Sequence, residues 1–246
     1  MNREQFYEIM SGEGTLDYEV YLQTKVLFAC QSPYGQLCNK DELQFQIVHQ
    51  IEELWMKLIA YTLLDIDEYL QQGNTNRVLT LFRRVHLAQR LMIEQVGLLE
   101  TMSPKEYQEI RLKLGQGSGQ ESPGFRTLLK MYQPIWSSFK TTYLDKRGLS
   151  VEKIYDSAYS HDDAYVVAEA LVEFDDLFQK FRQEHMRLIG RTIGLAAKSL
   201  KGRPVEILEE GMRQQFFPDL WEIRSKMTDK WGATYGVKRD SLHGHT

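Results

Sequence analysis

The sequence contains few cysteines. Cys30 and Cys38 are the only two, and they do not form a CxxC pair. Two cysteines cannot make a disulfide framework, and such usage is typical of a reducing compartment. The first ten residues, MNREQFYEIM, are charged and lack the apolar stretch of a secretory signal. We therefore expect a cytoplasmic protein.

The sequence also lacks a long apolar run and an excess of positive charge. No run approaches the roughly 18 apolar residues needed to span a bilayer. Lysine and arginine number 30 against 34 acidic residues, which gives a net charge of −4. A chain of this balance offers no basic surface for nucleic acid. We expect neither a membrane nor a nucleic acid as partner.

Alternating apolar and polar residues, the mark of a half-buried strand, are absent too. We find no internal repeat and no low-complexity linker. What the sequence does contain is apolar residues at helical spacing, in two long segments and several shorter ones. These patterns predict one all-helical bundle domain over residues 1–246, with a loosely held tail from about residue 230. The predicted helices cover 2–10, 16–31, 41–72, 77–100, a short segment from Pro104, 125–143, 164–197, 205–215 and 216–227.

The helix predicted over 41–72 is the longest in the first half of the chain. Asp41 is a candidate N-cap, with Gln44 three residues later as in a capping box. A second stripe on this helix carries Phe45, His49, Glu53 and Met56. The face predicted to be buried follows steps of three to five residues and consists of Ile47, Ile51, Leu54, Leu58 and Leu63.

Two of the six histidines, His49 and His185, lie centrally in the two longest predicted helices, on or beside the apolar side. A single histidine in such a place is more often a hydrogen-bonded core residue than a ligand. Two of them in one bundle favour a cofactor, because helix bundles hold cofactors through side chains of facing helices. The other four are predicted on the surface or in the tail: His86, His161, His243 and His245.

The residues around these histidines fit haem better than zinc. Zinc needs three or four ligands, and neither long helix has a second histidine or a Glu-x-x-His pair. Haem needs one strong axial ligand within an apolar wall. CxxCH is absent, so a haem would be held without covalent attachment. The wall that the sequence places near His185 consists of Phe178, Phe181, Leu188 and Thr192.

Arg111 follows Tyr107 by one helical turn and precedes the glycine-rich segment 114–124. A guanidinium in this place can hold a carboxylate with two hydrogen bonds. The alternative is a surface arginine paired with Glu106 or another nearby acid. Spacing alone favours the surface pair.

Four ordered blocks of the sequence are similar to motifs of the tryptophan 2,3-dioxygenase family, and together they cover most of the chain. DELQFQIVHQIEELWMKL, residues 41–58, resembles the family's DExLFIIxHQxxELWxKL. The block LETMSPKEYQEIRLKLGQGSGQESPGFR resembles LETLTPxEYxxFRxxLGxxSGFQSxQFR without a gap. FRQEHMRLIGRTIG, with FFPDLWEIR after it, resembles FRxxHxxxVxRxIG and FFPELFxxR. The N-terminal block LDYEVYLQTKVLFACQSP resembles TYGxYLxLDxLLxxQxP.

The resemblance implies an all-helical enzyme of the tryptophan and indoleamine dioxygenase type that uses haem b. It would insert O2 into the indole C2–C3 bond of L-tryptophan to give N-formylkynurenine. His185 would be the axial ligand of the iron, and His49 would hydrogen-bond the indole N–H. Phe45 would line the indole pocket.

The resemblance also implies roles for residues on other segments. Arg111 would hold the substrate carboxylate, with Tyr107 lining the same region. A homotetramer is implied as well, in which the helices of residues 1–31 pack on a neighbouring subunit. The remaining implied positions are Ser118 and Gly119 over the haem plane, and Tyr18, Tyr21 and Leu22 closing a neighbour's active site.

The chain departs from the family pattern at the substrate lid. The family's GTGGSSG loop is KSLKGRP here, residues 198–204, with Ser199 in the place of the threonine whose hydroxyl lies near the substrate ammonium. Gln120 and Glu121 replace a phenylalanine and a glutamine, and the segment between Arg126 and His185 is shorter. These changes leave two further functions open: a haem-dependent monooxygenase of a modified tryptophan or tyrosine, or a haem-binding helical protein without catalysis.

Overall fold

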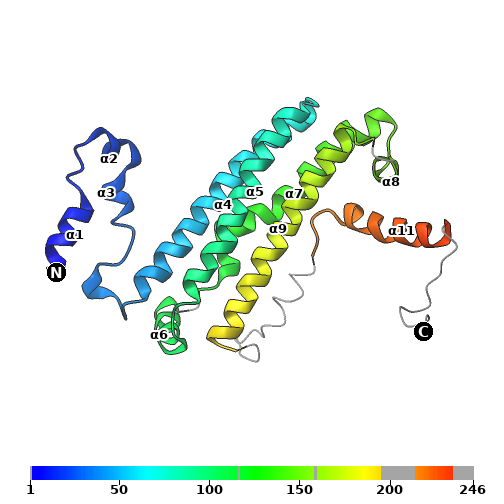
Figure 1. Cartoon of the computed structure of the whole chain (residues 1–246). Coiled ribbons are helices and arrows are strands. Elements are labelled where there is room, and N and C mark those ends of the chain that lie inside the picture. Colours follow the sequence, from blue (N-terminus) through cyan, green and yellow to red (C-terminus); the bar gives the residue numbers. More distant parts are fainter. Residues whose placement is uncertain (1, 116, 158–159, 195–213, 235–246) are drawn as a thin grey trace.

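The structure is a computed structural model that describes residues 2–115, 117–157, 160–194 and 214–234. Every regular element in these ranges is helical, which confirms the predicted all-α class. None of the described helices has the length and apolar character needed to cross a membrane. Four helices pack against one another to form the bundle and lie side by side in Figure 1, with further helices before and after them in the chain. The four are α4 (Glu42–Gln71), α5 (Thr75–Leu99), α7 (Pro123–Phe139) and α9 (Asp163–Thr192).

Helix α4 packs between α5 and α7, and α5 packs between α4 and α9. The turn between α4 and α5 requires Gly73, whose φ is +70°, a value that a side chain disfavours. Helix α9 runs parallel to α5: Gln89 Nε2 donates to the Phe174 carbonyl, and Arg191 pairs with Glu100 farther along both helices. The helices predicted over 41–72, 77–100 and 125–143 are therefore confirmed to within a few residues.

The inward face of α4 is not the one that spacing predicted. Ile47, Ile51, Leu54 and Leu58 are 37%, 36%, 52% and 39% exposed, and of the predicted stripe only Leu63 is buried. The predicted stripe and the stripe that is buried in the structure both carry apolar residues at helical spacing, so periodicity could not choose between them. Packing against α5 and α7 decides the choice. The apolar residues buried on α4 are Val48, Met56, Ile59, Ala60, Leu63, Ile66 and Leu70.

The start of α4 is capped by Asn39 rather than by Asp41. Asp41 already has helical backbone angles, φ −86° and ψ −14°, and its side chain makes no capping bond. Asn39 Oδ1 accepts hydrogen bonds from the backbone N–H groups of Asp41 and Glu42, at 3.0 and 3.2 Å. Gln44 donates to Thr101 Oγ1 at 3.0 Å instead of closing a capping box. The predicted boundary was right, although its cap was wrong.

The shorter elements refine the predicted helices at both ends of the chain. The helix expected over 16–31 is broken at Gln23, whose φ is +56°. Residues 145–163, expected to be irregular, include one short α-helix, and the last helix extends into the predicted tail. Predictions for 195–213 and 235–246 lie outside the described residues. The elements are α1 (Arg3–Ser11), α2 (Asp17–Leu22), α3 (Thr24–Leu27), η1 (Tyr34–Gln36), α6 (Pro104–Leu114), η2 (Gly119–Glu121), η3 (Lys140–Leu144, one π-turn), η4 (Asp145–Arg147), α8 (Val151–Tyr155) and α11 (Pro218–Thr234).

Asp175 ties the chain before α11 to the bundle. Its carboxylate is fully buried and accepts hydrogen bonds from the backbone N–H groups of Phe216 and Phe217, at 2.8 and 3.2 Å. Trp221 Nε1 donates to the same oxygen at 2.9 Å. The two phenylalanine rings then join the core beside Phe178, on the side of α9 that carries His185.

Candidate active site

His49 and His185 approach one another from α4 and α9. Burial, and to a smaller extent the nearby His49, lower the pKa of His185 to about 4. Burial also lowers the pKa of His49, against the opposing effects of the Phe45 carbonyl and the Glu53 carboxylate. Both imidazoles are therefore neutral at physiological pH and belong to one site.

The Phe45 carbonyl sets the tautomer of His49. Nδ1 lies 2.7 Å from this oxygen, and a carbonyl oxygen can only accept, so Nδ1 carries the proton and donates it. In the neutral ring Nε2 is then an acceptor. The Phe45 ring lies 4.1 Å from the imidazole, centroid to centroid, and forms a wall beside it. His49 thus offers one lone pair next to an aromatic surface.

His185 is a neutral imidazole for which no hydrogen bond occurs among the described residues. Its Cε1 would lie 3.3 Å from a Cβ placed on Gly119, so a side chain larger than glycine would press on the ring. The Phe181 ring lies 6.3 Å away on the same helix. A neutral imidazole with an unused nitrogen is the state that ligates iron. The residues present therefore fit a haem with His185 as its protein ligand.

Helix α6 brings Tyr107 and Arg111 to the same region. Ser103 caps this helix by accepting from Glu106 N–H, and Pro104 occupies its first turn, as predicted. The Tyr107 ring lies 6.3 Å from the Phe45 ring. Burial raises the pKa of Tyr107, while the positive charge of Arg111 opposes this shift. The positive charge of Arg111 therefore lies on the α6 side of the candidate site.

The glycine-rich segment is attached to α4 through Glu53. Gly124 N–H donates to Glu53 Oε2 at 3.0 Å, and a Cβ at Gly124 would lie 2.7 Å from Met56 Cβ. Ser118 caps η2, where its Oγ accepts from Gln120 N–H. Glu53 belongs to the stripe of Phe45 and His49, but its position in the sequence predicts no role for it. Its contact with Gly124 is long-range and could not be read from spacing.

Several predicted site residues do not join this cluster. Tyr18, Tyr21 and Leu22 are 71%, 87% and 44% exposed on α2, which stands to one side of the long helices in Figure 1. They make no part of the site within their own chain. Ser199 and the lid segment 198–204 lie outside the described residues.

His86, predicted on the surface, is buried. Its Nε2 donates to the Ala170 carbonyl at 3.0 Å, and its Nδ1 lies 3.2 Å from Glu173. The prediction was wrong because α9 covers His86, and the residue that its Nε2 contacts, Ala170, lies 84 positions away in the sequence. A groove of about 570 Å³ between α5, α9 and α11 is lined by His86, Glu173 and Trp221, away from the predicted site residues. Glu173 contacts both His86 and Arg90, so His86 takes part in the packing of α5 against α9.

The fold is all-helical, and its candidate site brings together two neutral histidines, an aromatic wall and an arginine. The chain belongs to the tryptophan 2,3-dioxygenase family, whose sequence profile matches residues 3–132. It is 30% identical to the tryptophan 2,3-dioxygenase of Myxococcus xanthus, over 87% of this chain and 91% of that protein. The protein of the same name from Serratia proteamaculans is 28% identical, over 86% of this chain and 93% of its own length.

Proposed function

We propose that this chain is a haem-dependent dioxygenase that inserts O2 into the indole C2–C3 bond of L-tryptophan and forms N-formylkynurenine. The observation that carries the proposal is the neutral His185 imidazole, without a hydrogen bond among the described residues, inside the site of a chain of this family. Two relatives that cover most of the chain are named for this reaction. The haem, when bound, would supply the activation of O2.

The side chains of α4 would orient the indole ring. His49 Nε2 is an acceptor and would receive the indole N–H, which fixes the direction in which the C2–C3 bond points. The Phe45 ring would cover one face of the indole and exclude water. Because His49 stays neutral, it offers this acceptor throughout the physiological pH range. These groups act by orientation, which lowers the barrier by holding the reactants in a productive geometry.

The other end of the substrate would lie toward α6 and the lid. Arg111 would bind the carboxylate with two hydrogen bonds, and Tyr107 would line the same end. Ser118 and Gly119 would lie over the haem plane, on the side of the segment that faces His185. Ser199 would offer its hydroxyl near the substrate ammonium.

We further propose that the enzyme is a homotetramer in the cytoplasm. Tyr18, Tyr21 and Leu22 are exposed on α2, where they would close the active site of a neighbouring subunit. A stripe of exposed apolar residues on α4, spaced by four and three residues, would also pack against a neighbouring subunit, because such spacing is typical of helices that pack on other helices. Cys30 and Cys38 are both free thiols, which suits a reducing compartment. The exposed α4 stripe consists of Ile47, Ile51, Leu54, Leu58 and Tyr61.

The test is incubation of haem-loaded protein with L-tryptophan, O2 and a reductant, followed by mass spectrometry of the product. Dioxygenation gives N-formylkynurenine, which is heavier than the substrate by both atoms of O2. A product that gains a single oxygen atom would overturn the dioxygenase in favour of a monooxygenase. A protein that shows no Soret band after haem addition, or a His185→Ala variant with an unchanged band, would overturn the assigned ligand.

A further inference from the structure

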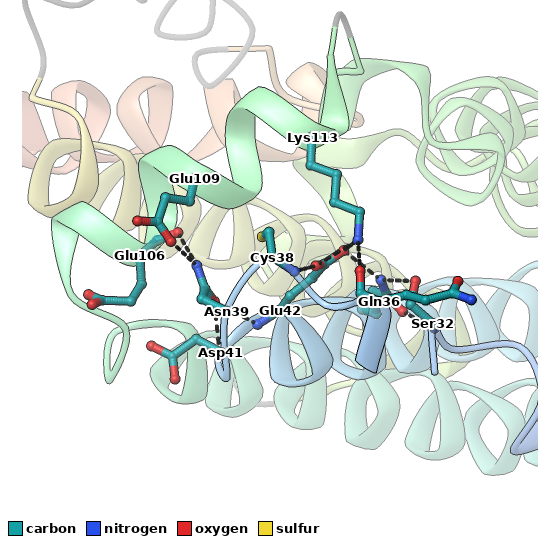
Figure 2. A network of polar contacts seen from close by, with 10 residues as sticks. Ser32, Gln36, Cys38, Asn39, Asp41, Glu42, Glu106, Glu109 and Lys113 are labelled. Atoms are coloured by element: carbon teal, nitrogen blue, oxygen red, sulfur yellow. Dashed lines mark hydrogen bonds and ion pairs between the residues drawn. The ribbon is translucent and has the colours of Figure 1, made fainter. Parts of the chain in front are cut away.

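The two halves of the substrate site stand on different helices. Phe45 and His49 belong to α4, whereas Tyr107 and Arg111 belong to α6. The distance between indole and carboxylate is fixed within tryptophan, so the enzyme must fix the position of α6 relative to α4. Figure 2 shows a polar network that joins the start of α4, the segment before it and α6.

Glu42 is the centre of this network. It lies in the first turn of α4, and only 4% of its surface is exposed. Lys113 Nζ of α6 lies 2.9 Å from each of its two carboxylate oxygens. Cys38 N–H and Gln46 Nε2 donate to the same carboxylate at 2.6 and 3.0 Å. Burial by itself raises the pKa of Glu42, but these hydrogen bonds and Lys113 outweigh it and hold the pKa below its ordinary value.

Helix α6 is attached to the segment before α4 at two places. Lys113 Nζ also donates to the Gln36 carbonyl at 2.7 Å. About one turn earlier, Asn39 Nδ2 donates to the Glu106 carbonyl and to Glu109 Oε2, at 2.9 and 3.0 Å. Two attachments spaced along the axis fix both the position and the rotation of a helix.

The rotation of α6 determines where Arg111 points. Arg111 precedes Lys113 by two residues, which is about 200° around an α-helix of 3.6 residues per turn. Tyr107 and Glu109 have the same offset. When Glu109 and Lys113 are held against the segment before α4, Tyr107 and Arg111 are therefore directed to the other side of α6.

We propose that Glu42 and Lys113 are positioning residues: their ion pair, in which the Glu42 carboxylate is buried and the Lys113 side chain is 42% exposed, fixes α6 so that Arg111 meets the substrate carboxylate while His49 meets the indole. This inference rests on the proposed function. Neither residue touches the substrate. Loss of the pair leaves His49, Phe45 and His185 in place and displaces only the carboxylate clamp.

The test compares two ligands in haem-loaded Lys113→Met protein. L-Tryptophan carries the carboxylate that Arg111 would bind, whereas tryptamine lacks it. We expect binding of L-tryptophan, followed by the Soret band, to weaken about tenfold and its KM to rise alike, because an orienting contact is lost. Binding of tryptamine, haem content and kcat should stay within twofold. Lys113→Arg, which keeps a cation against Glu42, should restore the wild-type value.

The matched control is Lys105→Met, the same substitution at an exposed position of α6. This control substitution should leave the binding of both L-tryptophan and tryptamine unchanged. Equal weakening of L-tryptophan and tryptamine in Lys113→Met, or no weakening of either, would overturn the positioning role. A wild-type protein that binds no haem or gives no response to L-tryptophan would overturn the proposed function and this inference with it. Haem binding and the response to L-tryptophan in the wild-type protein therefore distinguish failure of the proposed function from failure of the positioning role.

Discussion

The carbonyl of Phe45 decides which nitrogen of His49 can meet a substrate. Nδ1–H is used within the helix, at 2.7 Å from that carbonyl, so only Nε2 remains as an acceptor. His185 has the opposite character, because its ring has no such internal partner among the described residues. The two histidines, equal in the sequence, therefore differ in what they offer: one presents an acceptor in a fixed direction, and the other presents a ligand nitrogen.

The first prediction follows for His49→Ala. The variant should keep the Soret band of the wild type, because His185 is untouched. Its kcat/KM for L-tryptophan should fall about 10- to 100-fold, as is usual when a buried hydrogen bond to substrate is lost. His161→Ala, at an exposed position, serves as control. Loss of haem in His49→Ala would mean that the roles of the two histidines are reversed.

The second prediction concerns Arg111→Lys. Lysine keeps the charge but has no planar fork for two parallel hydrogen bonds to a carboxylate. We expect KM for L-tryptophan to rise about tenfold or more, with a smaller change in kcat. Steady-state kinetics would measure this rise in KM. The control is Arg187→Lys, the same substitution at an exposed position of α9. An unchanged KM would remove Arg111 from the substrate site.

At the scale of single elements, α4 does three things at once. Its first turn holds α6 through Glu42, Phe45 and His49 near its start line the candidate site, and Glu53 accepts a hydrogen bond from the start of α7. A helix of this kind cannot be purely apolar on its inward face. Glu52, one residue from Glu53, is buried at 9% exposure, and burial raises its pKa to about 7.

The third prediction is the pH dependence that Glu52 creates. The folded chain keeps this carboxyl protonated up to about pH 7, whereas the unfolded chain ionises it near its ordinary value of 4.5. Between these values the folded state binds more protons, so the free energy of unfolding falls as pH rises, by on the order of 3 kcal/mol. Glu52→Gln should remove this fall and unfold at higher urea than the wild type at pH 8. Glu68→Gln, exposed on the same helix, should leave the pH profile unchanged.

The fourth prediction concerns the contact between α7 and α4. Gly124→Ala would place a Cβ 2.7 Å from Met56 Cβ and 2.8 Å from Glu53 Oε2. Overpacking of this kind costs about 1–3 kcal/mol, so the midpoint of urea unfolding should fall. Gly97→Ala is the matched control: a Cβ there meets nothing within 4 Å inside α5. Alanine in a helix interior should stabilise by about 1 kcal/mol, and a fall at Gly97 as large as that at Gly124 would contradict the steric reason.

At the scale of the whole molecule, the chain leaves an unusual amount of apolar surface exposed. Besides the exposed α4 stripe, α5 exposes Leu87, Leu91 and Leu98. Helices α1 to α3 contain no buried apolar side chain and stand beside the long helices in Figure 1. Large exposed apolar areas mark interaction surfaces in soluble proteins. This surface is consistent with the proposed assembly of four copies.

The fifth prediction tests that assembly. Leu54→Glu with Leu58→Glu places two charges on the exposed α4 stripe and should lower the mass in solution from four chains toward fewer. Sedimentation velocity at several concentrations measures it. Lys57→Glu lies between them in sequence but at the edge of the stripe, about 60° around the helix from Leu54 and about 100° from Leu58, and it should keep the wild-type mass. An unchanged mass in the double variant would exclude this stripe as an interface.

The sequence by itself determined most of the helices and predicted the residues of the candidate site. Helical spacing placed the long helices to within a few residues, because an apolar face repeats every three to four positions wherever a helix packs. The motif blocks identified the family and singled out Phe45, His49, Tyr107, Arg111, Gly119 and His185. The structure gathers these residues around one region.

Only the tertiary structure decided which of two apolar stripes of α4 faces inward, that His86 is buried, and that Asn39 rather than Asp41 caps α4. The first two depend on residues far apart in sequence: α5 and α7 beside α4, and Ala170 beside His86. The cap is a local contact, but sequence offers both Asn39 and Asp41 as caps, and only the backbone path selects Asn39. The Glu42–Lys113 pair is of the same kind, since its partners are separated by 71 positions. Spacing along one helix reports which residues share a face. It carries no information about which other helix, or which charge, that face will meet.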